Sequence, residues 1–416
     1  MGKRELAQVS TPENILDFMV SLASPDLNGA VLEPGCGSAP FLRRVRDAFG
    51  SYKMEFFGVE IDREAASEAP DWVRLYTEDF LTWEPGVNFS LVIGNPPYGI
   101  VGSEEKYPIH SLLEKKAIYK SLFSTWKGKY NLYGAFVEKG VKLLRPKGML
   151  IYVIPASWLV LDDFSLLRSF LARSGANDIY YLGEVFEGKK VSAVVLMHQK
   201  SAYPGKLRLW DVKVDDRGKL IPTLWLEKGD WGGEMVRFEN DFTRELEGSG
   251  PSVGRVYEIR FAARSNEFKK NPEVRREQGP GLLPVLTGRN LKPGKIDYDT
   301  NYSGLWVSRE VARGIREFYD HQRLVVGHTK GTKVVAAWDE RAYPWREEFH
   351  LIPKEGWFPK PDDVVVYLNS DLVSRYVKTL YRDFVPHLTL RMLERIPLME
   401  SFFSSTPTRT RLDEEP

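Results

Sequence analysis

Cysteine is almost absent from this 416-residue chain, because Cys36 is the only one. A single cysteine excludes an internal disulfide framework and a cysteine-rich zinc site, and it is typical of proteins from a reducing compartment. The chain also lacks long apolar runs: the longest, Met149–Leu161, is too short to span a membrane and contains Pro155. The first ten residues form no apolar leader, so we expect a cytoplasmic protein.

Net charge is small as well, at a formal value of +1, but the charges are unevenly distributed. Residues 1–100 contain 8 basic and 15 acidic side chains, whereas residues 251–400 contain 25 basic and 20 acidic ones. Residues 101–147 contain ten basic and four acidic side chains. This distribution favours a polyanion bound by part of the chain. A solvated lysine face explains the same charges equally well, so both interpretations stay open.

Strand and helix patterns alternate along the first half of the chain. Thr11 followed by Pro12 predicts the start of a helix, with Thr11 as its N-cap. The alternation beyond it predicts an α/β domain with a Rossmann-like, doubly wound parallel sheet that binds ligands at the carboxyl ends of its strands. The expected strands are Ala30–Glu33, Phe56–Glu60, Phe89–Gly94, Gly148–Ile154, Ile179–Leu182 and Val191–Met197, and the expected helices include Leu132–Leu144 and Phe164–Ala172.

The pattern changes after about residue 240, where long periodic helices become sparse and Arg, Pro and Gly become frequent. The stretch Glu247–Gly254, which reads EGSGPSVG, has the composition of a linker. We therefore predict one domain at residues 1–240 and a second domain at residues 245–416.

A glycine turn follows the first expected strand, in the segment Val31–Gly37 (VLEPGCG). Gly35 and Gly37 allow a ligand to approach the backbone closely. The dinucleotide pattern G-x-G-x-x-G is not met, because Pro40 stands where the third glycine belongs. Without that phosphate cradle, the turn favours a nucleoside ligand that lacks phosphates.

Three acids lie where expected strands end: Glu33, Glu60 and Asp79. A carboxylate in the position of Glu60 can accept hydrogen bonds from both ribose hydroxyls. Asp79 is suited to reading an adenine amino group, with the ring of Phe80 beside it. Each acid alone is more often a helix cap or a solvated residue, but three such acids at strand ends together favour a nucleoside site.

Asn95–Tyr98 (NPPY) is the most informative stretch of the chain, and it follows a predicted strand. The exocyclic amino group of adenine is a poor nucleophile because its lone pair is delocalised into the ring. Two carbonyl oxygens, those of the Asn95 side chain and the Pro96 backbone, can accept hydrogen bonds from its two N–H groups. These hydrogen bonds localise the lone pair on nitrogen. The prolines remove competing backbone donors, and Tyr98 offers a ring for stacking. The alternative is a simple proline turn with Asn as a local cap.

A base inside a duplex cannot reach such a pocket, so it must be flipped out. Phe186 is our candidate for a second pocket wall, although a lone loop phenylalanine is usually a core anchor. Lys189 and Lys190 beside it are candidates to hold a phosphate or the base edge.

These motifs together resemble the gamma-type, adenine-specific DNA methyltransferases of type II restriction–modification systems. The resemblance rests on stretches from almost the whole chain, among them VLEPGCGSAPFLR, FGVEID, GNPPYGIVG, STWKGKYNLYGAF, RFAARS, VLTGRNLKPG and LYRDFVPHLTLRMLER. It implies an S-adenosylmethionine-binding catalytic domain, a mixed α+β C-terminal domain that recognises DNA, and no metal. It also implies a monomer that methylates the N6 atom of a flipped-out adenine in 5′-TCGA-3′, with a cognate restriction endonuclease as functional partner.

The resemblance also implies roles for individual residues. The implied cofactor pocket consists of Thr11, Glu33, Gly35, Glu60, Ile61, Asp79, Phe80, Asn95 and Pro97. The implied catalytic residues are Asn95, Pro96 and Tyr98, and the implied contacts to the target base are Phe186 and Lys189. Arg264, Lys292 and Arg382 are candidate phosphate contacts, although solvated side chains are the default interpretation of each. Pro386 is a candidate wedge for the gap that a flipped base leaves.

Three other functions fit parts of the pattern. Protein glutamine methyltransferases use the same tetrapeptide on a side-chain amide, but they resemble this chain only in its catalytic part. An RNA adenine methyltransferase is not excluded by any single residue. A nucleoside-sensing module without activity would not need an intact Asn-Pro-Pro-Tyr.

Overall fold

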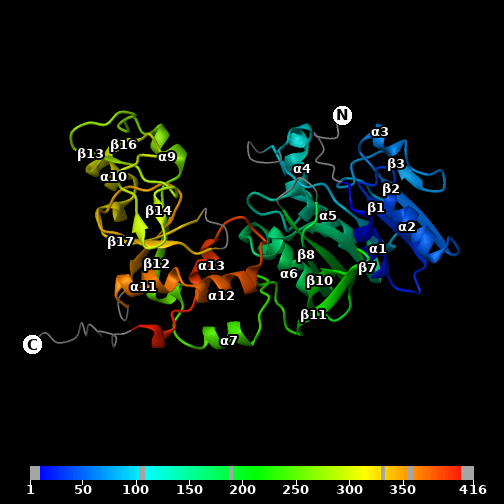
Figure 1. Cartoon of the computed structure of the whole chain (residues 1–416). Helices are drawn as coiled ribbons and strands as arrows, with labels where there is room; N and C mark the ends of the chain where they lie inside the picture. Colours follow the sequence, from blue (N-terminus) through cyan, green and yellow to red (C-terminus); the bar gives the residue numbers. More distant parts are fainter. Residues whose placement is uncertain (1–9, 103–107, 187–190, 329–332, 355–358, 404–416) are drawn as a thin grey trace, which may run out of the picture. The chain divides into compact units, whose positions relative to one another are not determined.

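The computed structural model describes residues 10–102, 108–186, 191–328, 333–354 and 359–403 (Figure 1). Its contacts divide the chain into two compact units, Met1–Val236 and Arg237–Pro416. Among the helices in these described stretches, none is both long and apolar enough to cross a membrane.

The first unit is built on a central sheet with the strand order β11-β10-β8-β9-β7-β4-β1-β2-β3. Strand β1 pairs in parallel with β2 on one side and with β4 on the other. The order therefore reverses between β1 and β4, which is where doubly wound sheets bind ligands. The strands of this sheet are β1 (Gly29–Pro34), β2 (Met54–Val59), β3 (Arg74–Tyr76), β4 (Phe89–Gly94), β7 (Leu144–Pro155), β8 (Gly175–Glu184), β9 (Ser192–Lys200), β10 (Leu207–Val214) and β11 (Leu220–Lys228).

The predicted α/β class and doubly wound sheet are confirmed, but the sheet, which was expected to be parallel, is mixed. Strand β9 runs antiparallel to both of its neighbours, β7 and β8. The reason is the short connection from Glu184 to Ser192, because a parallel crossover needs a dozen or more residues. The antiparallel pair β10–β11 was not predicted at all.

Helices cover both faces of this sheet (Figure 1). Successive residues of a strand face opposite sides, and Leu91 and Ile93 of β4 belong to the core that includes α1 and α2. On the opposite face, a Cβ atom on Gly140 of α5 would lie 2.6 Å from Leu150, so this close approach requires glycine. The helices and minor elements of the unit are α1 (Glu13–Ser21), α2 (Pro40–Phe49), α3 (Arg63–Ala66), β5 (Ile100–Val101), β6 (Pro108–Ile109), η1 (His110–Lys115), α4 (Lys116–Leu122), α5 (Leu132–Leu143), η2 (Ala156–Leu159), η3 (Asp162–Phe164) and α6 (Ser165–Ser174).

The start of α1 differs from the prediction, because Pro12 rather than Thr11 is the N-cap residue. The Pro12 carbonyl accepts from the backbone N–H groups of Ile15 and Leu16 at 3.0 and 3.1 Å. No side chain caps this helix. The Thr11 hydroxyl is therefore available for a contact outside the helix, which is described with the site below.

The second unit is a mixed α+β structure, as predicted. Its main sheet has the order β12-β19-β17-β18, and all of its pairings are antiparallel. The elements of this unit are α7 (Asp241–Glu247), α8 (Val253–Val256), β12 (Tyr257–Phe261), α9 (Ser265–Lys270), β13 (Leu282–Pro284), β14 (Leu291–Lys292), β15 (Lys295–Ile296), β16 (Trp306–Ser308), α10 (Arg309–Ile315), η4 (Glu317–Asp320), β17 (Arg323–Val326), β18 (Ala336–Asp339), β19 (Phe349–Pro353), α11 (Pro361–Leu368), α12 (Asp371–Tyr381), α13 (Leu390–Glu394) and η5 (Glu400–Phe402).

The interpretation of residues 247–254 as a linker is wrong, because this segment is packed inside the second unit. The Val253 N–H donates to the Ile396 carbonyl at 2.7 Å, and the Leu398 N–H donates to the Pro251 carbonyl at 2.8 Å. A Cβ atom on Gly250 would lie 1.9 Å from the Leu398 oxygen. The small residues therefore reflect close backbone packing rather than a flexible connection.

Candidate active site

A cavity of about 550 Å³ in the first unit opens where β1, β2 and β4 end. Its size lies in the range of pockets that bind small molecules and cofactors. The nine residues of the predicted cofactor pocket all line this cavity, and Pro96 lines it with them. These residues are Thr11, Glu33, Gly35, Glu60, Ile61, Asp79, Phe80, Asn95, Pro96 and Pro97.

The glycine turn after β1 is held against the end of β2. Gly35 and Gly37 have φ angles of 67° and 48°, in the left-handed region that favours glycine. The Gly35 N–H donates to the Val59 carbonyl at 2.7 Å, and the Gly37 N–H donates to Glu60 Oε2 at 3.0 Å. The turn therefore positions the backbone along the cavity wall and fixes the Glu60 side chain at the same time.

Glu33 lies at the end of β1 and is only 2% exposed. Its Oε2 atom accepts from the Leu42 N–H at 3.0 Å, so this carboxyl also satisfies a donor in the first turn of α2. Burial raises the pKa of Glu33 to about 8, with a smaller upward contribution from the charge of Glu60, against the hydrogen bonds from the α2 backbone. Glu33 is therefore both part of the cavity wall and an anchor for α2.

Backbone donors already hold both oxygens of Glu60. Oε1 accepts from the Asp62 N–H at 2.9 Å, and Oε2 accepts from Gly37. Each carboxylate oxygen can accept a second hydrogen bond. Glu60 can thus still accept from ribose hydroxyls, in an orientation that the protein sets before a ligand binds.

Two side chains that were not predicted from the sequence to belong to the site hold Asp79 in place. Its Oδ2 atom accepts from Lys115 Nζ at 2.9 Å and from the Tyr119 hydroxyl at 2.7 Å. Its Oδ1 atom accepts from the Leu81 N–H at 3.0 Å. Burial and the neighbouring charge of Asp79 raise the pKa of Tyr119 above its usual range, so this hydroxyl stays protonated and donates. The lysine-rich composition of residues 101–147 was the only signal for this contact in the sequence.

The Asn95–Tyr98 segment is held at both ends. Asn95 Nδ2 donates to Thr11 Oγ1 at 3.0 Å. After the tetrapeptide, the Gly99 N–H donates to Asn131 Oδ1 at 2.9 Å, and the Tyr98 hydroxyl donates to the Val153 carbonyl at 3.0 Å. The turn is therefore anchored to the segment before α1, to the N-cap residue of α5 and to β7 rather than standing as a free loop.

Tyr98 and Phe186 lie next to each other, although they are 88 positions apart in the chain. Their ring centroids are 5.9 Å apart, and the planes cross at 68°. The Phe186 ring is 5% exposed and packs with the core, so a structural role accompanies any role in binding. The predicted contact Lys189 lies outside the described residues.

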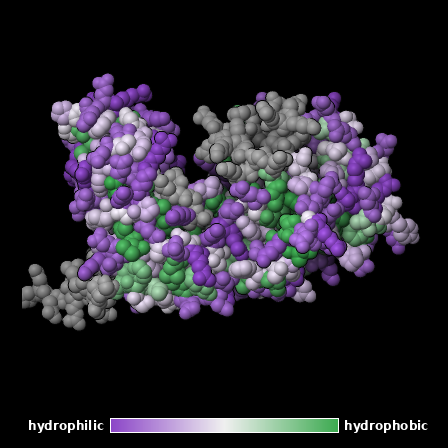
Figure 2. Space-filling view, in the orientation of Figure 1, coloured by the Kyte–Doolittle hydropathy of each residue, from purple (hydrophilic) through white to green (hydrophobic). Residues whose placement is uncertain are grey.

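The candidate DNA contacts in the second unit differ in exposure. Arg264, Lys292 and Pro386 are exposed, whereas Arg382 is half-buried with its guanidinium carbon 5.0 Å from the centroid of the Phe238 ring. The visible surface around α9, α10 and β16 consists mostly of hydrophilic residues (Figure 2). Arg264 and Lys292 can thus reach an external ligand, while Arg382 has a packing role whatever else it does.

Family models match this chain in both units. Residues 52–186 match the Eco57I restriction-modification methylase family, and residues 283–398 match the TaqI-like C-terminal specificity domain. The fold is similar to that of the Type IIL restriction-modification enzyme MmeI in complex with DNA, with a TM-score of 0.51 at 12% identity over 82% of this chain and 59% of that one. It is also similar to the DrdV–DNA complex, with a TM-score of 0.53 at 13% identity over 96% of this chain and 56% of that one. The first unit thus matches a methylase family and the second a specificity-domain family, and the two solved structures share the fold of this chain.

One relative narrows this assignment further. The chain is 61% identical to the Type II methyltransferase M.TthHB8I of Thermus thermophilus over 397 residues, which is 95% of this chain and 91% of the relative. It is also 26% identical to the Type II methyltransferase M.HincII of Haemophilus influenzae over 205 residues, which is 48% of this chain and 38% of the relative. The chain belongs to the type II methyltransferases of restriction–modification systems.

Glu33 should make the stability of the first unit depend on pH. Its folded pKa of about 8 lies above the ordinary value of 4.5, so between these values the folded chain keeps a proton that the unfolded chain releases. The free energy of unfolding therefore falls as pH rises through this window, by at most about 1.4 kcal/mol per pH unit. Glu33→Gln cannot ionise, so its stability relative to wild type should rise between pH 5 and pH 8 in urea titrations.

The exposed Glu55 on β2 provides a matched control: its surface ion pair with Arg74 contributes little to stability, so Glu55→Gln should differ little from wild type throughout the series. A Glu33→Gln difference that is equally flat would contradict the assignment of a buried, protonated Glu33.

Proposed function

We propose that this chain transfers a methyl group from S-adenosylmethionine to the N6 atom of a flipped-out adenine in duplex DNA. The observation that carries the proposal is the position of Asn95 and Pro96 on the wall of the cavity, with the Tyr98 and Phe186 rings beside each other next to this turn. The cavity and the aromatic pair thus adjoin the same turn.

The residues of the cavity fit S-adenosylmethionine. Glu60 can accept from the ribose hydroxyls, Asp79 can accept from the adenine amino group, and the buried Phe80 ring lies in the same wall. Gly35 and Gly37 let the backbone approach the ligand, and no phosphate cradle is needed. When bound, this cofactor supplies an electrophilic methyl group on a sulfonium centre.

Asn95 and Pro96 then act on the target amino group. The two carbonyl oxygens accept hydrogen bonds from its two N–H groups. The nitrogen lone pair is then drawn out of the ring and toward the methyl carbon. The cofactor held by Glu60 and Asp79 would supply its methyl group to this nitrogen as its C–S bond gives way, and solvent would take up one amino proton. The prolines contribute by removing backbone N–H donors that would compete for the same acceptors.

Tyr98 and Phe186 are proposed to hold the target base outside the duplex. A base–aromatic contact contributes roughly 1–3 kcal/mol, which can offset the cost of unstacking. The hydrogen bond from the Tyr98 hydroxyl to Val153 keeps its ring in one orientation. Lys189 is retained in this proposal as a contact to the base or to a phosphate.

The second domain is proposed to select the sequence. We assign the cofactor and the chemistry to residues 1–240 and DNA recognition to residues 245–416, where the specificity-domain family matches. Arg264, Lys292 and Arg382 would neutralise phosphates, and Pro386 would fill the gap left by the base. The motifs resemble the Taq I modification methylase, so the proposal includes 5′-TCGA-3′ as target, action as a monomer and a cognate endonuclease.

Asn95→Ala removes one acceptor for the reacting amino group and should lower kcat by about 10²–10³-fold, the usual effect of removing one preorganised hydrogen-bond partner from a reacting centre. Cofactor binding, followed by calorimetry, should change much less. Methyl transfer is measured with labelled S-adenosylmethionine on a duplex that contains the target.

Asn28 is exposed at the opposite end of β1 from the cavity and offers a matched control, since Asn28→Ala should keep the wild-type rate. A near-normal rate of methyl transfer by Asn95→Ala would contradict the proposed mechanism.

Base flipping can be followed with 2-aminopurine at the target position, because its fluorescence rises when the base unstacks. Tyr98→Ala and Phe186→Ala should each weaken capture of the base by roughly 1–3 kcal/mol. Thermal unfolding is recorded in parallel, since Phe186 is also part of the core. Tyr52→Ala, which truncates a tyrosine that is 82% exposed, should capture the base normally. If both pocket variants match this control, the two rings do not form the pocket.

A further inference from the structure

The link between Thr11 and the tetrapeptide joins residues 84 positions apart. Asn95 Nδ2 donates to Thr11 Oγ1 at 3.0 Å, and both half-buried side chains line the cavity. From the sequence, Thr11 was expected to cap the first helix and, by resemblance, to line the cofactor pocket. The observed contact instead connects the start of the chain to the side chain that is proposed to act on the target amino group.

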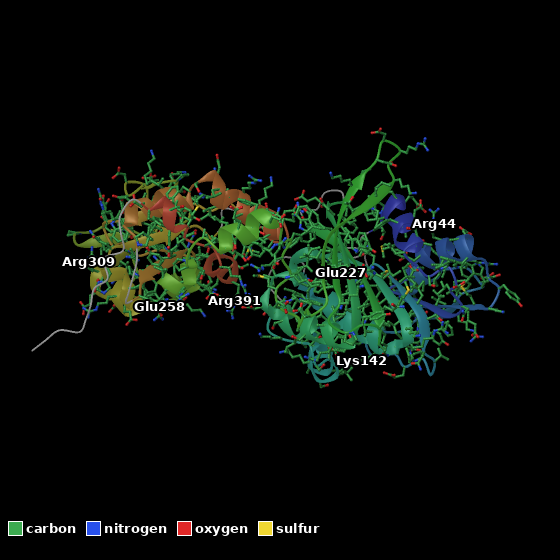
Figure 3. The ribbon with its side chains drawn as sticks, turned by 90° about the horizontal axis from the view of Figure 1, so that it is seen from below. Arg44, Lys142, Glu227, Glu258, Arg309 and Arg391 are labelled. Carbon is green, nitrogen blue, oxygen red and sulfur yellow. The ribbon has the colours of Figure 1, made fainter. Side chains whose placement is uncertain are left out.

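The position of Thr11 is set by the packing of α1. Ile15 and Met19 of this helix are buried in the core. Arg44 of α2 (Figure 3) pairs with Glu13 and, at 3.1 Å, with Asp17. The helix begins two residues after Thr11, so the hydroxyl is held by a packed element and not by a free chain end.

The side-chain amide of asparagine has two ends of nearly the same shape and opposite hydrogen-bonding character. If Nδ2 faced the target amino group, two hydrogen-bond donors would face each other. The lone pair of the target nitrogen would then not be localised. An amide that donates through Nδ2 to Thr11 directs its carbonyl oxygen away from Thr11. The partner behind the amide therefore decides which end is presented.

The other anchors of the tetrapeptide do not make this choice. The Asn131 side chain binds the Gly99 backbone, and the Tyr98 hydroxyl binds the Val153 backbone. Both contacts fix where the turn lies, but neither touches the Asn95 amide. The Thr11 hydroxyl accepts directly from this amide and can act on its orientation.

We propose that Thr11 is a positioning residue that holds the Asn95 amide with Oδ1 toward the target amino group. This inference rests on the proposed function. Thr11 acts through Asn95, so its removal should slow the methyl-transfer step itself rather than only weaken binding.

Thr11→Val replaces the hydroxyl with a methyl group of similar size. Single-turnover methyl transfer at saturating S-adenosylmethionine and DNA should slow by about tenfold, the kinetic equivalent of one lost hydrogen bond in the transition state. Thr11→Ser keeps the hydroxyl and should restore the rate to within about twofold of wild type. Thr223→Val, at an exposed position of β11, controls for the chemical change alone and should have no effect.

A double-mutant cycle separates orientation from cofactor contact. In an Asn95→Asp background, the side chain has two equivalent oxygens when ionised, and no donor end can face the target. Adding Thr11→Val there should cost less than about twofold, whereas the same change costs about tenfold beside asparagine.

The proposal is overturned if Thr11→Val keeps the wild-type rate at saturating cofactor and loses only cofactor affinity in calorimetry, because Thr11 would then be a cofactor contact. An equal cost in both backgrounds overturns it as well. If Asn95→Asp has no measurable rate, the comparison of Thr11→Val with Thr11→Ser decides. A wild-type chain that does not methylate adenine would instead refute the proposed function on which this inference rests.

Discussion

The parallel pairing of β1 with β2 and β4 is the constraint on which the site depends. Parallel neighbours end at the same edge of a sheet, so Glu33, Glu60 and Asn95 are brought together although they are far apart in the sequence. The antiparallel strand β9 pairs with β7 on the side away from β4, so it pairs with none of the three strands whose ends form the cavity. The change of strand direction therefore leaves the geometry of the cavity intact.

A second property of the site is that its polar groups are hydrogen-bonded within the protein before a ligand binds. Glu60 and Asp79 accept from backbone N–H groups two residues further along the chain, and Glu33 accepts from a backbone N–H group in the first turn of α2. A carboxyl group held in this way needs little rearrangement when a ligand arrives, which lowers the ordering cost of binding. The tetrapeptide follows the same rule, since contacts from Thr11, Asn131 and β7 hold it. The acceptors of the site are thus organised before a ligand binds.

Most of the candidate site could be predicted from the sequence, because its residues stand at the ends of short apolar strands. Strand β4 has the bounds that its apolar pattern predicts, and Asn95 follows directly. Contacts between distant segments could not be predicted. No residue near Thr11 in the sequence indicates its contact with Asn95, and none near Asp79 indicates its contact with Lys115. Such pairs arise only when the chain packs.

Errors in the predicted fold have local physical causes. The helix was expected to be capped by Thr11, but its N-cap residue is Pro12. Small residues that pack closely against Leu398 have the composition of a linker. The hairpin β10–β11 carried a signal in its turn, where Asp215 accepts from the N–H groups of Arg217 and Lys219, but its strands mix charged and apolar residues on an edge of the sheet. Edge strands are harder to predict than the buried β4, because one face or both can meet water.

The central claim is that the tetrapeptide modifies an adenine amino group in DNA at one sequence. The most direct measurement is modification-sensitive sequencing of genomic DNA from a host without methylation of its own that expresses the chain. We predict N6-methyladenine at a single short sequence, with 5′-TCGA-3′ as the expected one, and no such mark with the Asn95→Ala variant. Unmodified adenine in DNA, together with methylation of RNA or of protein glutamine by the purified chain, would contradict the account.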